Sequence, residues 1–441
     1  MTLNRSGRGA VIFIFLTVLV DTIGFGIILP VTPRLVMELS GEGLAKAAIY
    51  GGWLGFVYAL MQFFCAPILG GLSDRYGRRP VILAALGALG TDYLIMGFAP
   101  NLHWLFLGRT IAGMAGASFT PAYAYLADVT PPERRAQNFG LVGAAFGMGF
   151  IIGPAVGGLL GEFGPRAPFF AAAALALANC VFGFFVLPES LPLASRRPFE
   201  LRRANPLGTL MQVRRYPAVI GLMTALFIWQ LGHQVLPSTW AFYTIYRFNW
   251  SPGMVGASLA FVGVIMAVST AGLTRALVPR LGERRAALLG IVSGFVVYLG
   301  YAFATEGWMI YVAMLPWLFA GMVHPSMQAI MSHAIPPNAQ GELQGGIASL
   351  YSISSIAGPP LMTQLFGYFS SGAAPVHFPG AAFLCAALLS FAAALLFLRA
   401  VGGTIADTAK TNATQNDTAR TGPAQTEPAG TPSATAPDPT I

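Results

Sequence analysis

The feature that most constrains this chain is a series of apolar stretches, each close to the length of about 20 residues that an α-helix needs to cross a lipid bilayer. Twelve such stretches follow one another, separated by clusters of Gly, Pro and Arg. They occupy approximately residues 10–30, 48–71, 81–99, 104–126, 138–160, 168–188, 216–238, 252–274, 286–304, 308–331, 343–367 and 379–399. With 55% hydrophobic and only 10% charged residues, the sequence predicts an all-α membrane protein with twelve transmembrane helices.

Positive charge is distributed unevenly between the two ends of these helices. Lys and Arg are retained in cytoplasmic loops, so their distribution indicates the orientation in the membrane. Of the 25 Lys and Arg residues, those that do not fall on the side of the N-terminus are Arg34, Lys46, Arg166, Arg247 and the intramembrane Arg109. Because twelve crossings return the chain to its starting side, both termini are expected in the cytoplasm. The same bias explains the net charge of +8 without a nucleic-acid partner.

The sequence predicts neither a cleaved signal peptide nor a cofactor site. The first apolar run continues to Pro30 without a small-residue cleavage pattern, which favours a retained helix over a signal peptide. Cys65, Cys180 and Cys385 all fall within predicted crossings and indicate neither a disulfide framework nor a metal site. With no nucleophile, metal or nucleotide constellation, the sequence predicts neither an enzyme nor a bound cofactor.

The chain contains an internal duplication. VTPPERRAQNFG at 129–140 matches AIPPNAQGELQG at 334–345, and Gly77 and Gly153 have counterparts in Gly282 and Gly358, all at an offset of 205 positions. An even number of crossings per copy keeps both copies in the same direction, so two six-helix bundles related by a pseudo-twofold axis are expected. The predicted parts are the bundles 1–188 and 216–399, an Arg- and Pro-rich cytoplasmic linker at 189–215, and a disordered cytoplasmic tail at 400–441.

The stretch GGLSDRYGRRPVIL at 70–83 joins the second and third crossings. Gly77 permits a tight turn, and Pro80 suits the first turn of the following helix. Simple anchoring by positive charge would explain the arginines, but not Asp74 or the glycine spacing. The pattern G-x-L-S-D-R-x-G-R-R-P resembles the loop signature of the major facilitator superfamily.

In that superfamily the loop forms a charge latch that is made and broken as the transporter alternates between inward-open and outward-open states. By this resemblance, Asp74 and Arg78 are the expected partners. The resemblance assigns the latch role to Gly71, Asp74, Arg75, Gly77, Arg78 and Arg79.

A glycine motif occupies the fifth crossing, in GAAFGMGFIIGPAVGG at 143–158. Gly149, Gly153 and Gly157 recur at four-residue spacing, which places them on one helix face where another helix can approach closely. Pro154 is expected to bend the helix. The motif resembles the one that marks antiporters within the superfamily, and close helix packing is a purely structural reading of the same residues.

Three charged residues lie within predicted crossings of the first half: Asp21, Asp92 and Arg109. A charge at mid-membrane costs about 2.5–3.5 kcal/mol on insertion scales, so Arg109 requires a partner unless it extends to the interface. We predict that the three form a proton-coupling group. The structural alternatives are a satisfied buried acid or a residue lining a watery cavity for Asp92, and local helix breaking near Gly24 and Gly26 for Asp21.

Long stretches between about 20 and 370 resemble the tetracycline efflux proteins of Gram-negative bacteria. They include YALMQFFCAPILGGLSDRYGRRPVIL, GTDYLIMGFAP, LFLGRTIAGMAGA and GELQGGIASLYSISSIAGPPL. By position, Asp21, Asp92 and Arg109 match functional intramembrane charges of that family, and Gln62 matches a polar substrate-side residue. The resemblance implies a monomer in the bacterial inner membrane that exchanges protons for a small molecule, taken alone or as a divalent metal complex.

The second half departs from this pattern. Met266 stands where the tetracycline pumps carry a coupling histidine, and Gly294 where they carry an aspartate. Two histidines in crossings, His233 and His324, could supply a replacement base, although a lone membrane histidine is more often only hydrogen-bonded. The residues predicted to contact substrate are Gln62, His233, Gln234 and His324.

Two functions fit these observations. The first is proton-coupled efflux of amphipathic small molecules, tetracycline-like or related, in which substrate and proton compete for a cavity that carries Asp92. The alternative is proton-coupled uptake of a small anionic solute, with Arg109 as the partner of the anion. A non-transporting membrane sensor on the same scaffold would need patterned or appended segments, and the tail at 400–441 shows no such patterning.

Overall fold

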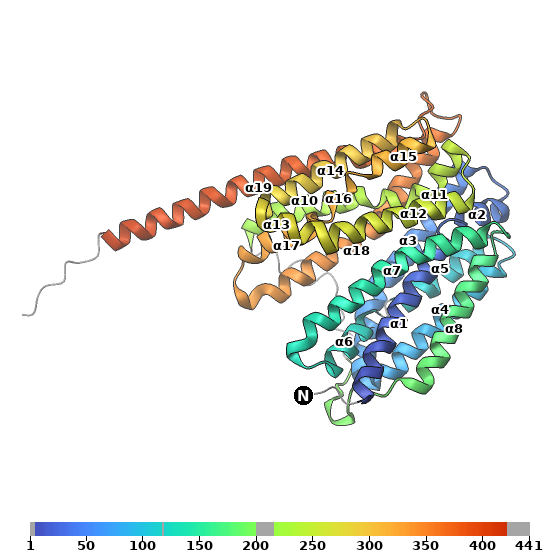
Figure 1. Ribbon diagram of the computed structural model, residues 1–441, viewed down its shortest axis with the longest axis horizontal. Coiled ribbons are helices and arrows are strands. Elements are labelled where there is room, and N and C mark those ends of the chain that lie inside the picture. Colours follow the sequence, from blue (N-terminus) through green and yellow to red (C-terminus); the bar gives the residue numbers. More distant parts are fainter. Residues whose placement is uncertain (1–4, 117–118, 200–215, 421–441) are drawn as a thin grey trace, which may run out of the picture.

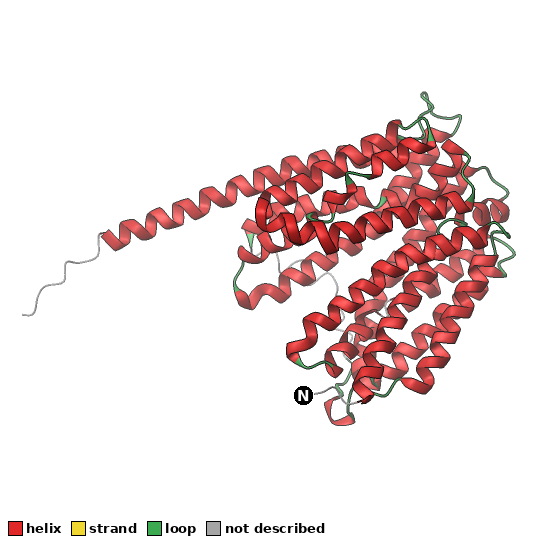
Figure 2. Ribbon diagram, in the orientation of Figure 1, coloured by secondary structure: helices red, strands yellow, loops and turns green. Residues whose placement is uncertain are grey.

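The computed structural model describes residues 5–116, 119–199 and 216–420, and the regular secondary structure of these residues is helical throughout (Figure 2). The helices of the N-terminal half are α1 (Arg5–Ile28), α2 (Thr32–Ser40), α3 (Leu44–Tyr76), α4 (Arg78–Gly97), α5 (Leu102–Gly116), α6 (Phe119–Val129), α7 (Arg135–Gly161) and α8 (Ala167–Val186). Short 3-10 helices, η1 (Pro132–Arg134) and η2 (Leu193–Ser195), precede α7 and follow α8.

The C-terminal half repeats this order with more interruptions. Its helices are α10 (Pro217–His233), α11 (Val235–Phe248), α12 (Pro252–Val268), the π-helix η4 (Ser269–Leu273), α13 (Thr274–Leu281), α14 (Glu283–Phe303), α15 (Gly307–Met314), α16 (Trp317–Ala320), α17 (Val323–His333), the 3-10 helix η5 (Pro337–Ala339), α18 (Gln340–Ser370) and α19 (Ala381–Arg420). The π-helix continues α12 into α13.

The prediction of twelve crossings is confirmed. Ten helical segments of the described chain are long and apolar enough to cross a membrane, with α10–α11, α12–α13 and α15–α17 each counted as one segment. The α5–α6 segment, which residues 117 and 118 divide, supplies an eleventh crossing. The twelfth is α18, 31 residues long, whose Gly, Ser and Gln content lowers its hydropathy. The chain is therefore a multi-pass membrane protein.

The two halves touch at one end of the molecule and separate at the other (Figure 1). Helix α7 packs against α12, and α3 packs against α18. We call the end where the halves touch, near α2 and α11, the closed end. At the opposite end lie the N-terminal end of α1, at the bottom of the view, and the C-terminal end of α19, on the left. We call this the terminus-bearing end.

Small residues allow the close approach at the closed end. A Cβ added at Gly158 would lie 2.6 Å from the carbonyl oxygen of Pro252 and 3.1 Å from the Cα of Gly256. A Cβ at Gly52 would meet the side chain of Thr363 on α18. Since bulkier residues would hold the helices apart, these glycines define how tightly the halves meet.

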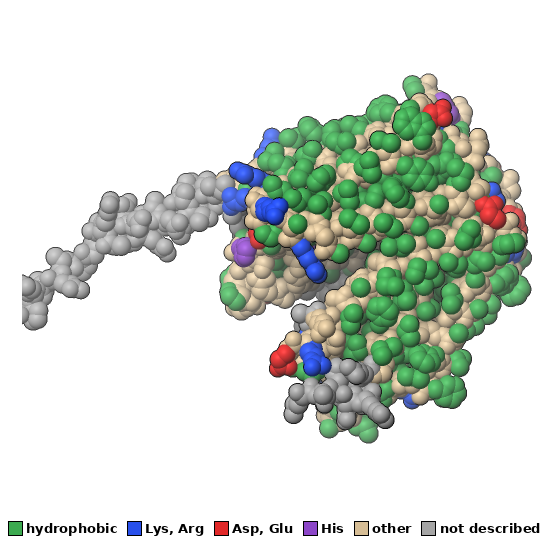
Figure 3. All heavy atoms as spheres, in the orientation of Figure 1, with side chains coloured by type: hydrophobic (Ala, Val, Ile, Leu, Met, Phe, Trp, Pro, Cys, Tyr) green, Lys and Arg blue, Asp and Glu red, His purple; other side chains and the backbone are tan. Residues whose placement is uncertain are grey.

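The surface matches a membrane setting. Hydrophobic side chains cover the flanks of both halves, and the surface is hollowed between the halves toward the terminus-bearing end (Figure 3). Lys and Arg gather mainly at that same end.

The segments outside the bundles are described only in part. Helix α19 continues to Arg420, well beyond the predicted end of the last crossing at 399, where a disordered tail was expected to begin. Neither Gly nor Pro occurs between residues 404 and 420, so nothing in this stretch breaks a helix. Most of the predicted linker, and the tail from 421 onward, lie outside the described residues.

Candidate functional site

A cavity of about 460 Å³ lies between the two halves. Its volume is within the range of small-molecule binding sites. The N-terminal half contributes mainly residues of α1 to α5, and the C-terminal half mainly residues of α11 and α18 together with Gln234 at the junction of α10 and α11. Apolar and aromatic side chains such as Phe25, Trp240 and Phe242 make up most of the wall, and a few polar groups converge on it.

Arg109 of α5 lines this cavity and is paired with Asp92 of α4. Its Nη2 lies 3.3 Å from Oδ2 of Asp92 and also donates to the sulfur of Met96 at 3.1 Å. The side chain of Asp92 is completely buried, whereas that of Arg109 is 12% exposed. The partner that an intramembrane arginine requires is therefore the acid of the preceding crossing.

This contact depends on the glycine that precedes Arg109. A Cβ added at Gly108 would lie 2.6 Å from Oδ1 of Asp92. Helices α4 and α5 are antiparallel neighbours joined by a short connection. Because Gly108 has no side chain, the carboxylate of Asp92 fits against α5 at this position.

One expectation about the site is wrong. Asp92 was expected on the cavity wall, but its buried side chain is not among the lining residues. Its ion-pair partner Arg109 does line the cavity. The sequence predicts that both Asp92 and Arg109 lie in the membrane. It does not predict which of the two lines the cavity.

The acid that lines the cavity is Asp21 of α1. Its residue is 9% exposed, and among the described residues its Oδ1 has no hydrogen-bond partner. Within the part of the chain that the structure describes, Arg109 forms its ion pair with Asp92 and not with Asp21. The three charges therefore border one region, as one ion pair and one separate carboxylate.

Two glutamines line the cavity from opposite halves. Gln62 of α3 donates from Nε2 to the carbonyl oxygen of Gly116, at 3.2 Å. Gln234 donates from Nε2 to the hydroxyl of Ser355, at 2.9 Å. In each case the bond involves the amide nitrogen.

The two histidines lie elsewhere in the C-terminal half and do not line the cavity. His233 stacks on Trp229 at 12° between ring planes, and its Nδ1 is 3.1 Å from the hydroxyl of Tyr298. His324 is exposed, with its Nδ1 2.6 Å from the hydroxyl of Tyr351. Both are hydrogen-bonded histidines, the structural alternative considered from the sequence.

Gly294 and Met266, the two positions that lack the titratable groups of the tetracycline pumps, make packing contacts. Gly294 is buried on α14, and the nearest atom to a Cβ added there is Nε1 of Trp229, at 3.6 Å. This indole nitrogen is itself buried without a partner among the described residues. Met266 is partly buried near the end of α12.

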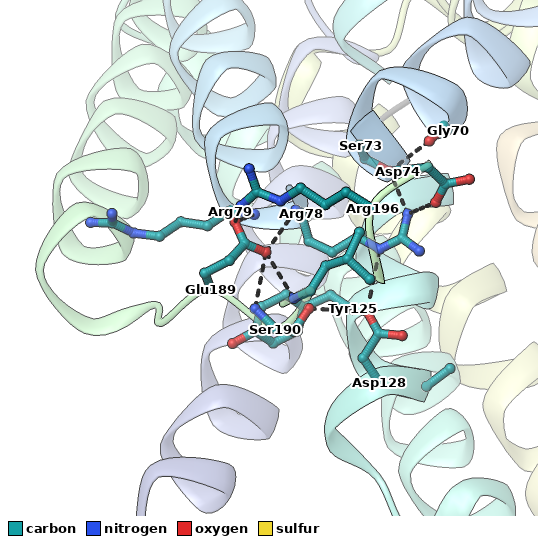
Figure 4. Close-up of polar contacts among 12 residues, drawn as sticks. Gly70, Ser73, Asp74, Arg78, Arg79, Tyr125, Asp128, Glu189, Ser190 and Arg196 are labelled. Atoms are coloured by element: carbon teal, nitrogen blue, oxygen red, sulfur yellow. Dashed lines mark hydrogen bonds and ion pairs between the residues drawn. The ribbon is translucent and has the colours of Figure 1, made fainter. Parts of the chain in front are cut away.

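The latch loop, residues 71–79, is organised by Arg78 at the terminus-bearing end (Figure 4). Its guanidinium bonds the carboxylate of Asp74 at 2.5 Å, the hydroxyl of Ser73 at 2.6 Å and, through Nε, Oδ2 of Asp128 at 3.3 Å. The expected contact between Asp74 and Arg78 is present. All of these partners belong to the N-terminal half.

A third carboxylate, Glu189, holds the start of α4 (Figure 4). It accepts backbone N–H bonds from Arg78 at 2.8 Å and Arg79 at 3.3 Å, as anions commonly do at helix N-termini. Gly77 has φ +105°, and a Cβ there would collide with this carboxylate. Both the positive φ angle and the contact with Glu189 therefore require glycine at position 77.

The remaining latch residues make local contacts. The guanidinium of Arg75 lies over the ring of Tyr76, and Arg79 donates to the carbonyl oxygen of Phe184 at 2.6 Å. A Cβ added at Gly71 would lie 2.9 Å from the ring of Phe199.

Asp128 and Glu189 are not among the residues predicted from the sequence. The signal available for them was their position: both follow apolar crossings on the side of the arginine-rich loop.

The glycine motif of α7 faces α1. Cβ atoms added at Gly149 and Gly153 would lie 2.6 Å from the side chain of Thr22 and 2.7 Å from the carbonyl oxygen of Ile23, and one at Gly157 would collide with the backbone of Ile27. Thr22 directly follows Asp21 in α1. Because α7 also packs against α12, it joins the helix that carries Asp21 to the interface between the halves.

Helix composition, two packed halves and a central cavity with buried charges define a membrane transporter of the alternating-access type. The family model of the Major Facilitator Superfamily matches residues 14–359, and the chain belongs to this superfamily. The chain is similar to transporters and resistance proteins. These similarities group it with transporters of small molecules rather than with enzymes.

Within the superfamily, the chain is similar to tetracycline resistance proteins. It is 42% identical to the class C protein of Escherichia coli, over 82% of this chain and 91% of that protein. It is 34% identical to the class B protein of Escherichia coli, over 79% and 86%. Multidrug resistance protein 2 of Bacillus subtilis is 29% identical, over 80% and 88%.

Solved structures agree on the fold. The human organic anion transporter MFSD10 (TETRAN) matches with a TM-score of 0.66 and 25% identity, over 89% of this chain and 100% of that one. The nucleoside transporter NupG matches with a TM-score of 0.67 and 15% identity, over 90% and 99%.

Proposed function

We propose that this protein exports amphipathic small molecules, tetracycline-like drugs or related compounds, in exchange for protons. The observation that carries this proposal is the carboxylate of Asp21, which lies at the wall of a cavity of drug size and has no ion-pair partner among the described residues. An ionised group without a partner in a largely apolar site is costly. Either a proton or a cationic cargo would remove this cost, and the two would therefore compete for Asp21.

The charges of the site favour efflux of a cation over uptake of an anion. Arg109 faces the cavity, which is the one observation that favours the anion symporter. Its charge is already balanced by Asp92, however, so the charge left over is that of Asp21. We assign Asp92 the role of a positioning residue that holds Arg109 in place.

The orientation follows from the distribution of Lys and Arg. We propose that the terminus-bearing end faces the cytoplasm and that the protein lies in the bacterial inner membrane with both termini inside. The described conformation is then inward-open, ready to accept cargo from the cytoplasm. The latch loop lies at this end, and its ion pairs within one half would rearrange when the halves close here.

The cargo meets a different wall on each half. Asp21, Gln62 and Arg109 provide the charged and polar side, and Gln234 with the aromatic residues of α11 provides the uncharged side. A divalent metal would enter as part of a metal–drug complex, since Asp21 is the one carboxylate among the described lining residues. We expect the monomer to be the transporting unit, because both walls come from one chain.

Transport into inverted membrane vesicles with an imposed pH gradient tests the proposal. Addition of a transported drug should release protons from vesicles that contain the wild type. Asp21→Asn should lower this drug-driven proton release at least about tenfold, the size of a lost charge-assisted interaction. Glu42→Gln, which removes a carboxylate paired only with Lys46, is the matched control.

Two outcomes would count against the proposal. Asp21→Asn exporting as well as the wild type would remove Asp21 from the coupling mechanism. Proton flow in the same direction as solute would favour the anion symporter. The same assay addresses the latch. Arg78→Lys should slow transport, because an ammonium lacks the planar fork of donors through which the guanidinium bonds Asp74, Ser73 and Asp128. Arg75→Lys should not slow transport.

A further inference from the structure

The contact between the halves at the closed end includes a charged residue. Glu162 follows the last residue of α7, in the N-terminal half. Its carboxylate accepts a hydrogen bond from the backbone N–H of Gly253, at 2.9 Å, in the first turn of α12 of the C-terminal half. The side chain of Ser251, the N-cap residue of α12, is near this carboxylate and helps to lower its pKa.

This geometry suits the start of a helix. Ser251 has extended backbone angles and accepts from the N–H of Met254 at 3.4 Å, so its own hydroxyl hydrogen is free to point at Glu162. The first N–H groups of a helix lack intrahelical partners and carry partial positive charge, which a carboxylate complements. Glu162 thus supplies from one half what the helix of the other half requires.

Neighbouring acids at the same end behave differently. Glu38 pairs with Arg166 and Glu42 pairs with Lys46, and each of these pairs lies within the N-terminal half. A relative motion of the halves would leave both pairs intact. It would break the bond between Glu162 and Gly253, since the two residues belong to different halves.

We infer that Glu162 is a positioning residue of the transport cycle, which holds the closed end shut by capping α12 across the interface while the cavity is open at the terminus-bearing end. The inference rests on the alternating access of the proposed function. In the outward-open state the ends of α7 and α12 separate and the cap is lost. The bond therefore favours the inward-open state and sets how often the protein opens outward.

The protonation state of Glu162 is coupled to the same bond. Ser251, the N–H of Gly253 and, more weakly, the charge of Arg34 on α2 lower the pKa of this carboxyl below its ordinary value of 4.5. Arg34 is the charged side chain that acts on the Glu162 carboxyl. Arg166 instead bonds Glu38 and two backbone carbonyl oxygens. The stabilisation is complete above the ordinary value and is lost as pH falls through the lowered one. Between pH 8 and 5 the cap should act at constant strength.

The test measures outward opening without any cargo. Cys65, Cys180 and Cys385 are replaced by Ala, and Ser238, which lines the cavity, is changed to Cys. Right-side-out vesicles are then treated with a membrane-impermeant maleimide, which reaches residue 238 only when the closed end opens. Glu162→Ala should raise the labelling rate about twofold to fivefold, the effect of losing an anion at a helix N-terminus.

Two further variants separate a specific cap from general loosening. Glu162→Gln keeps an oxygen acceptor without the charge and should give an intermediate rate. Glu42→Gln removes a charge from the same end and should leave the rate unchanged. The ratio of the rates for wild type and Glu162→Gln should stay constant from pH 8 to 5.

An unchanged rate in Glu162→Ala, or an equal rise in Glu42→Gln, would overturn the inference, as would a ratio that titrates between pH 8 and 5. Because the assay uses neither drug nor proton gradient, a failure of the efflux proposal would leave its result unaffected.

Discussion

At the scale of single residues, the central feature is the separation of one ion pair from one lone carboxylate. Asp92 is completely buried and paired with Arg109, whereas Asp21 lines the cavity directly. The sequence identified all three as intramembrane charges, and the need of Arg109 for a partner could be predicted from the cost of burial. Which acid would take that place depends on how α1, α4 and α5 face one another, which a single sequence does not encode locally.

Gly108→Ala tests the ion pair without removing a charge. The new Cβ would lie 2.6 Å from Oδ1 of Asp92, so the carboxylate or the helix must shift. We expect a loss of about 1–3 kcal/mol of stability, typical of overpacking, and slower transport. Thermal unfolding of the purified protein and the vesicle assay measure the two effects. Wild-type values in both would show that the pair tolerates the displacement.

At the scale of helices, α7 is the element that connects the site to the interface. One face meets α1 through Gly149, Gly153 and Gly157, and another meets α12 near Gly158. The four-residue glycine spacing predicted close packing on one face. It did not reveal the second contact, which needs glycines of both halves to coincide. Glu189 escaped prediction for a similar reason, since its bond to Arg78 joins residues 111 positions apart.

Gly157→Ala tests the packing of α7 on α1. Its Cβ would collide with the backbone of Ile27, whereas a Cβ at Gly147 on the same helix meets no atom within 4 Å. We expect Gly157→Ala to destabilise the protein by about 1–3 kcal/mol, and Gly147→Ala to be neutral or slightly stabilising. The thermal unfolding midpoints of the two variants provide the comparison. Equal midpoints would contradict the close contact.

At the scale of the whole molecule, most of the architecture could be predicted from hydropathy and the repeat. The twelve crossings follow from apolar length, and the offset between Pro131 and Pro336 extends across both bundles. The polar composition beyond 399 predicts disorder, whereas α19 continues as a helix to Arg420. The cavity could not be located either, since it forms where α3, α11 and α18 meet and no one segment carries its pattern. For the same reason, the sequence could not show that His233 and His324 lie outside this cavity.

Proton release on cargo binding tests the central claim most directly. Purified protein in weakly buffered detergent solution is mixed with a transported drug, and the released protons are counted with a pH-sensitive dye. If drug and proton compete for Asp21, binding should release up to one proton per protein molecule in the wild type and none in Asp21→Asn. Equal release by both proteins, or drug binding to the wild type without any release at a pH where Asp21 is protonated, would contradict the account.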